Sequence, residues 1–113
     1  MFPPPRAAAQ GALEEGGATI GILPDEEAGR ENPFISIVIP TGLGIGRNVI
    51  IARSARAIIA VGGEYGTLSE IAFGLQLGRP VVGLGSWDVP GVRHAENPID
   101  AVAMAVRYLG AKD

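Results

Sequence analysis

The sequence predicts an α/β fold in which a parallel sheet is covered by helices on both faces. Two observations lead to this prediction. Four short aliphatic runs alternate along the chain with four helical patterns. The runs also lack alternation of polar and apolar residues, as at residues 57–61, and strands buried on both faces have this composition. With right-handed crossovers the result is an open, Rossmann-like sheet and a three-layer sandwich.

The elements follow from these patterns in chain order. Strands are predicted at residues 18–23, 35–39, 57–61 and 80–84. The first three helices are predicted at residues 6–15, 46–55 and 67–77. Between residues 24 and 33 the chain is polar and charged, which predicts a surface loop.

The fourth helix has the clearest ends. Asn97 can cap it, Pro98 suits its first turn, and Gly110 can close it. Its apolar residues fall on one helical face, namely Ile99, Val102, Ala105, Val106 and Leu109.

Composition narrows the classes of function. The chain has 113 residues, which suits a single domain over residues 1–113. It has no cysteine and one histidine, so we predict no disulfide, thiolate nucleophile or metal site. The net charge of -3 gives no positive potential that would attract nucleic acid. No apolar run is long enough to span a membrane. We therefore expect a cytoplasmic protein with neither nucleic-acid nor membrane partners.

Two glycine-dense segments follow the second and third predicted strands, at residues 40–48 and 62–70. Open α/β sheets bind ligands at the carboxyl ends of their strands, and glycine lets backbone N–H groups approach an anion closely. Arg47 adds a planar fork of donors that suits phosphate. Tight structural turns would give the same glycine pattern. Neither segment is a Walker A motif or a dinucleotide fingerprint.

Thr67, Glu70 and Tyr65 of the second segment each allow a structural interpretation and a ligand-binding one. Thr67 and Glu70 have the spacing of a capping box, which requires no ligand. A carboxylate at this position can also bind ribose hydroxyls or act in acid–base chemistry. Tyr65 can stack on a planar group or simply cover the loop. The predicted ligand-binding residues are Thr41, Gly42, Gly44, Arg47, Asn48, Gly62, Gly63, Tyr65, Gly66, Thr67 and Glu70.

The segment from Arg47 to Glu70 resembles the lysine-decarboxylase-like superfamily. That superfamily includes the Lonely Guy cytokinin phosphoribohydrolases and the molybdenum cofactor carrier proteins. The hydrolases have an Arg-Lys pair upstream of a Pro-Gly-Gly-x-Gly-Thr-x-x-Glu stretch, and the resemblance implies that Arg47 and Glu70 match their catalytic residues. It likewise implies that Gly63, Gly66 and Thr67 match the phosphate-binding loop.

Departures from the hydrolase pattern weaken the implication of hydrolysis. Asn48 replaces the lysine, Gly62 the proline and Glu64 a glycine. The chain is more similar to the cofactor-carrier branch, which has comparable motifs at residues 21–24, 31–34, 40–48 and 63–70. The likeness covers about residues 11–84.

The resemblance implies a function in two alternative forms. The first is binding of a phosphorylated nucleotide-like or pterin-type ligand at the glycine-rich loops, with no required cofactor. The molybdenum cofactor and a nucleoside monophosphate are the implied ligands. The alternative is a phosphoribohydrolase that cleaves the N-glycosidic bond of nucleoside 5′-monophosphates, so the sequence leaves open whether the protein is an enzyme.

Two further expectations concern the extent of the fold and its assembly. Superfamily members begin with an additional strand–helix–strand segment where this chain has residues 1–5, so we expect an N-terminally truncated domain with an exposed sheet edge. A small sheet buries limited area, so we also expect a homodimer or higher homo-oligomer. The helix faces around Ile50, Ile51, Ile71 and Leu75 are the predicted interface.

Overall fold

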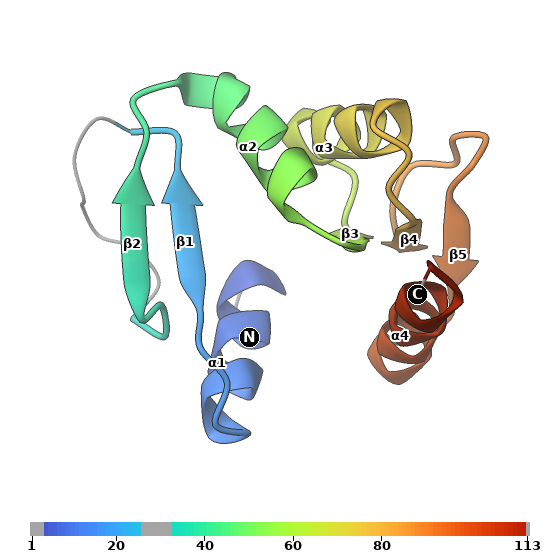
Figure 1. Ribbon diagram of the computed structural model, residues 1–113, viewed down its shortest axis with the longest axis horizontal. Coiled ribbons are helices and arrows are strands. Elements are labelled where there is room, and N and C mark those ends of the chain that lie inside the picture. Colours follow the sequence, from blue (N-terminus) through green and yellow to red (C-terminus); the bar gives the residue numbers. More distant parts are fainter. Residues whose placement is uncertain (1–3, 26–32, 113) are drawn as a thin grey trace. The chain divides into compact units, whose positions relative to one another are not determined.

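The computed structural model describes residues 4–25 and 33–112 (Figure 1). The chain divides into two compact units, Met1–Arg47 and Asn48–Asp113. Among the described residues, the strand pairs of both units are parallel, which confirms the predicted α/β class. No helix in this part of the chain is long and apolar enough to cross a membrane.

The first unit contains helix α1 (Pro4–Glu14), strands β1 (Ile20–Leu23) and β2 (Ile37–Pro40), and the short 3-10 helix η1 (Gly44–Gly46). β1 and β2 form a two-stranded sheet in which Ile20 pairs with Ile37. Buried Thr19 explains why β1 begins later than predicted. Its hydroxyl donates to the main-chain oxygen of Phe34 at 2.6 Å and accepts from the N–H of Ser36 at 2.7 Å. These side-chain bonds tie the entrances of the two strands together.

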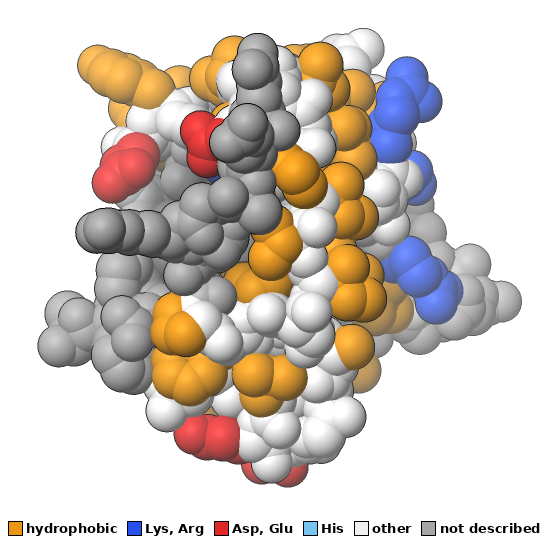
Figure 2. All heavy atoms as spheres, turned by 90° about the vertical axis from the view of Figure 1, so that its left-hand side faces the viewer, with side chains coloured by type: hydrophobic (Ala, Val, Ile, Leu, Met, Phe, Trp, Pro, Cys, Tyr) orange, Lys and Arg blue, Asp and Glu red, His pale blue; other side chains and the backbone are white. Residues whose placement is uncertain are grey.

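One face of this small sheet is apolar and exposed. Ile20, Ile37 and Ile39 lie on it by strand register and are 57%, 50% and 45% exposed. Figure 2 shows hydrophobic side chains gathered on the side of the molecule that carries β2. Most of the surface loop predicted between residues 24 and 33 falls outside the described residues.

The second unit forms three layers. It contains helix α2 (Arg47–Ser54, whose first residue ends the first unit), strand β3 (Ile58–Val61), helix α3 (Tyr65–Gln76), strands β4 (Val81–Leu84) and β5 (Arg93–Ala95), and helix α4 (Pro98–Lys112). The sheet has the order β3-β4-β5. Ile58, Ala60 and Val81 form one buried cluster with Ile71 of α3. Val82 instead joins Ala101 and Ala105 of α4 in a separate cluster, so the two helices cover opposite faces of the sheet (Figure 1).

β5 was not predicted from the sequence. It has three residues, Arg93–Ala95, with Arg93 and His94 exposed, so it has no aliphatic run to signal a strand. It forms because it pairs with β4 in register, Gly83 opposite His94.

The predicted start of α4 is confirmed, whereas its predicted end at Gly110 is wrong. The N–H of Asp100 donates to Oδ1 of Asn97 at 2.8 Å, the bond of an N-cap. The buried face consists of Ala101 and Ala105 with the partly buried Met104 and Tyr108. The residues Ile99, Val102 and Val106 are 85%, 54% and 59% exposed, and the helix continues past Gly110 to Lys112. The helix is apolar on two faces, and its smaller residues are the ones that fit against the sheet.

Ile71 cannot contribute to an interface between subunits. It is 0% exposed and lies inside the cluster between α3 and the sheet. This part of the predicted interface is therefore wrong, because the apolar face of α3 that the sequence suggested for assembly is used within the unit.

Gly74 lets α3 approach the sheet closely. A Cβ atom at this position would lie 2.6 Å from Cδ1 of Ile58 and 3.1 Å from Cγ2 of Val81. We expect Gly74→Ala to lower the free energy of unfolding by about 1–3 kcal/mol, the usual cost of overpacking. Urea denaturation measures this change. Gly11→Ala in α1 is the matched control, because a Cβ there meets no atom within 4 Å and should stabilise by about 0.5–1 kcal/mol. A stabilised Gly74→Ala variant would contradict the packing of α3 on the sheet.

Candidate functional site

The second glycine-dense segment connects β3 to α3. Gly62 has a φ of +86°, a conformation that side chains with a Cβ rarely adopt, and its N–H donates to the main-chain oxygen of Leu84 at 3.3 Å. Glu64 is the N-cap residue of α3, and its side chain makes no capping hydrogen bond. The N–H groups of Tyr65, Gly66 and Thr67 form the first turn, where an α-helix offers no intrahelical partner. This end of α3 therefore presents unpaired donors and the positive end of the helix dipole.

The capping box predicted for Thr67 and Glu70 is wrong. α3 begins at Tyr65, so Thr67 is already the third helical residue and Glu70 lies one turn further along. The Thr67 side chain is half-buried in the first turn, and the half-buried Glu70 lies within the helix. Glu64 takes the N-cap position instead.

Asn48 is buried against the first turn of α3. It is 2% exposed, and its Nδ2 donates to the main-chain oxygen of Gly66 at 3.4 Å and to Oγ of Ser69 at 3.3 Å. Its Oδ1 is buried without a hydrogen-bond partner in the described structure. A buried acceptor without a partner is uncommon, since leaving one unpaired costs about 1–3 kcal/mol. Within this unit, the start of α2 and the start of α3 are thus joined by an amide that retains a free acceptor.

Two aromatic residues lie at the same end of α3. Tyr65, its first residue, is 80% exposed and stacks on Trp87, with ring centroids 5.9 Å apart and an interplanar angle of 27°. Nε1 of Trp87 donates to the main-chain oxygen of Glu64 at 3.0 Å. Trp87 was not among the predicted site residues, although a lone tryptophan just after the fourth predicted strand was a visible signal.

The first glycine-dense segment, up to Arg47, belongs to the other unit and is hydrogen-bonded to the end of β1 and the residues that follow it. The N–H groups of Gly42 and Gly44 donate to the main-chain oxygens of Asp25 and Pro24 at 2.7 and 2.9 Å. The Thr41 hydroxyl donates to the main-chain oxygen of Leu23 at 2.6 Å. These bonds fold the segment back onto the end of β1, so its amides are engaged in a structural turn.

Arg47 follows this turn and is half-buried. Its Nη1 donates to the main-chain oxygen of Ile22 at 2.7 Å. A guanidinium has five N–H donors, so this bond orients the group and leaves other donors for an anion.

A model of the SLOG cluster4 family matches residues 5–107. The chain belongs to the SLOG cluster4 family. An uncharacterized protein of Archaeoglobus fulgidus is 45% identical over 97 residues, which cover 85% of this chain and 64% of that protein. This chain therefore spans less than two thirds of its archaeal relative.

Solved structures similar to this SLOG cluster4 member include carriers of a cofactor. The molybdenum cofactor binding protein of the phototrophic bacterium Rippkaea orientalis is 34% identical with a TM-score of 0.82, over 90% of this chain and 69% of that one. The molybdenum cofactor carrier protein of Chlamydomonas reinhardtii is also 34% identical, with a TM-score of 0.79, over 91% and 69% of the two chains. The predicted resemblance to the superfamily with its carrier branch is confirmed.

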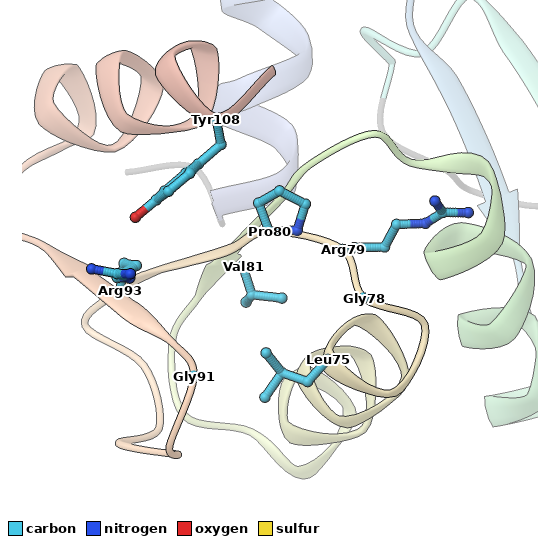
Figure 3. Close-up of a pocket in the computed structure, with 8 residues that line it drawn as sticks. All are labelled: Leu75, Gly78, Arg79, Pro80, Val81, Gly91, Arg93 and Tyr108. Atoms are coloured by element: carbon cyan, nitrogen blue, oxygen red, sulfur yellow. The ribbon is translucent and has the colours of Figure 1, made fainter. Parts of the chain in front are cut away.

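This family member also has a cavity of about 300 Å³ at the opposite, amino end of its β4 and β5 strands (Figure 3). Its lining residues are Leu75, Gly78, Arg79, Pro80, Val81, Gly91, Arg93 and Tyr108, and none of them is a predicted ligand-binding residue. Arg79 donates through Nε and Nη2 to the main-chain oxygens of Ala52 and Arg53 at the end of α2. The Arg93 guanidinium lies 5.9 Å from the centre of the Tyr108 ring. Within residues 4–25 and 33–112, no three acidic or histidine side chains gather as a potential metal site.

Proposed function

We propose that this protein binds the molybdenum cofactor, a pterin that carries a phosphate group, at the amino end of α3. The observation that supports this best is the uncapped first turn of α3 behind a Gly-Gly turn. Such a turn binds phosphate through backbone N–H groups and the helix dipole. The similarity to two solved proteins described as binding or carrying the molybdenum cofactor supports the choice of ligand.

The residues of this end suit such a ligand. Gly63, Gly66 and Thr67 offer backbone donors to the phosphate, and the Thr67 hydroxyl adds another. Asn48 lies against the same turn, where its Nδ2 donates to the main-chain oxygen of Gly66 and its buried Oδ1 has no hydrogen-bond partner in the described structure. Gly62 in the loop and Glu70 on α3 remain predicted ligand contacts.

The first glycine segment has a different role in this proposal. Because the N–H groups of Gly42 and Gly44 are already bonded, these residues and Thr41 would shape the loop that carries Arg47. The convergence of Arg47 with the α3 loop stays a prediction. Cytoplasmic location and homo-oligomeric assembly also stay predictions.

Phosphoribohydrolase activity is not proposed. The hydrolase pattern has a lysine where this chain has Asn48, and the amide of Asn48 is neutral, buried and bonded to the first turn of α3. A nucleoside 5′-monophosphate therefore serves as the competing ligand in the test.

The test is a titration of the protein with a pterin monophosphate, followed by calorimetry and by the emission of Trp87, the only tryptophan. We expect saturable binding by the wild type. Arg47→Gln should weaken it by more than about tenfold, because hydrogen bonds to charged groups contribute about 1.5–3 kcal/mol.

The matched control is Arg53→Gln, which removes the same charge from an exposed position on α2 and should bind like the wild type. An absence of saturation in the wild type, or an equal loss in both variants, would contradict the proposal. Release of adenine from adenosine monophosphate would instead support the hydrolase alternative.

A further inference from the structure

We infer that Tyr65 and Trp87 form an aromatic platform on which the planar ring of a phosphate-bearing ligand stacks. This inference rests on the proposed function, because it assigns the ring of the same ligand whose phosphate binds the first turn of α3. It adds Trp87 as a positioning residue and names the ligand class as a planar heteroaromatic ring joined to an oxyanion.

The geometry leaves one face of the Tyr65 ring open. Trp87 stacks on the other face at a centroid distance of 5.9 Å and an angle of 27°. Because Tyr65 is still 80% exposed, Trp87 covers only a small part of its surface. A second flat ring can therefore add to the stack without displacing either residue.

Trp87 holds this arrangement in place. Its indole N–H donates to the main-chain oxygen of Glu64, the residue that directly precedes Tyr65. Its side chain also packs against the buried cluster between α3 and the sheet, which includes Ile58 and Ile71. The platform is thus attached both to the core and to the N-cap of α3. Because its side chains are already ordered, they lose little conformational entropy when a ligand binds.

The Tyr65 side chain contributes little to the stability of the fold. An aromatic ring that remains 80% exposed contributes little burial, and tyrosine is a weaker helix former than alanine or glutamate. Its position next to Gly66 and Thr67, whose N–H groups begin the helix, places a stacking surface beside an anion-binding turn. Asn48 packs against this same turn through its Nδ2, and its Oδ1 is buried without a hydrogen-bond partner in the described structure.

The two parts of the site can be tested separately with two probes. A pterin monophosphate has both ring and phosphate, whereas inorganic phosphate has only the anion. We expect Tyr65→Ala to weaken binding of the pterin monophosphate by at least about fivefold, the lower range for loss of one ring stack. Its affinity for inorganic phosphate should equal that of the wild type. Tyr65→Phe keeps the ring and should recover most of the affinity that Tyr65→Ala loses.

Trp87→Phe tests the positioning role, because it keeps an apolar ring but loses the N–H that bonds to Glu64. Calorimetry should show weaker binding of the pterin monophosphate and unchanged binding of inorganic phosphate. Urea denaturation of each variant identifies any loss that comes from unfolding.

The outcomes separate this inference from the proposed function. If Tyr65→Ala binds the pterin monophosphate as tightly as the wild type does, the platform is overturned while the phosphate site stands. Equal loss for both probes would also overturn the platform, since the residue would then act on the helix end. If the wild type binds neither probe, the proposed function itself fails.

Discussion

Replacing Ile71 by alanine is expected to lower the free energy of unfolding by about 2–5 kcal/mol, the range for truncating a fully buried aliphatic side chain. Ile71 is 0% exposed and belongs to the cluster that joins α3 to β3 and β4. Those strands and α3 also position the candidate site. The loss of stability therefore affects the elements on which ligand binding depends. Urea denaturation followed by circular dichroism measures it.

Ile99→Ala is the matched control, since it makes the same truncation on another helix at a residue that is 85% exposed. Its free energy of unfolding should change by no more than about 0.5 kcal/mol. A small effect at Ile71 would show that α3 does not pack on the sheet as described. A large effect at Ile99 would show that the outer face of α4 is covered in solution.

The four aliphatic strands could be predicted because continuous Val and Ile runs carry their own signal. β3 and β4 begin within one residue of the predicted positions, at Ile58 and Val81. β5 could not be predicted, because Arg93 and His94 adopt a strand only by pairing with β4. Local sequence contains no information about such a pairing partner.

The sequence does not determine which apolar face of a helix packs against the sheet. α4 has Ile99, Val102 and Val106 on one side and Ala101 and Ala105 on another, and hydrophobicity favours the first set. The sheet accepts the small side chains instead, because they allow close approach. For α3 the sequence shows that Ile71 is apolar, but it does not show that Ile71 packs against the sheet and is therefore buried within the unit.

The place of the candidate site could be predicted and its details could not. Two glycine-dense segments at strand ends were recognised, but the hydrogen bonds that engage Gly42 and Gly44 depend on the return of the chain to Pro24 and Asp25. Because α3 begins at Tyr65, Thr67 lies inside the helix and cannot be its N-cap as predicted. Trp87 comes from the loop after β4, so only the folded chain brings it to Glu64.

Gly66→Asp is expected to make the protein more stable and its ligand binding weaker. The position lies in the first turn of α3, where a carboxylate interacts favourably with the helix dipole by about 0.3–1 kcal/mol. Aspartate is a slightly better helix former than glycine, and a Cβ at this position meets no atom within 4 Å, so the substitution adds no steric cost. The same negative charge lies where we propose that phosphate binds. Charges about 4 Å apart repel by about 1–4 kcal/mol between water and the protein surface, so affinity should fall by at least about fivefold. Gly66→Asn has nearly the same shape without the charge and serves as the control.

Paired urea denaturation and phosphate-probe titration of Gly66→Asp is the most direct test that the amino end of α3 binds an anion. The expected result is a raised free energy of unfolding together with at least about a fivefold loss of affinity for the pterin monophosphate, while Gly66→Asn retains most of the affinity. Wild-type affinity in a folded Gly66→Asp variant would contradict the account, because a phosphate at this helix end could not tolerate the added charge.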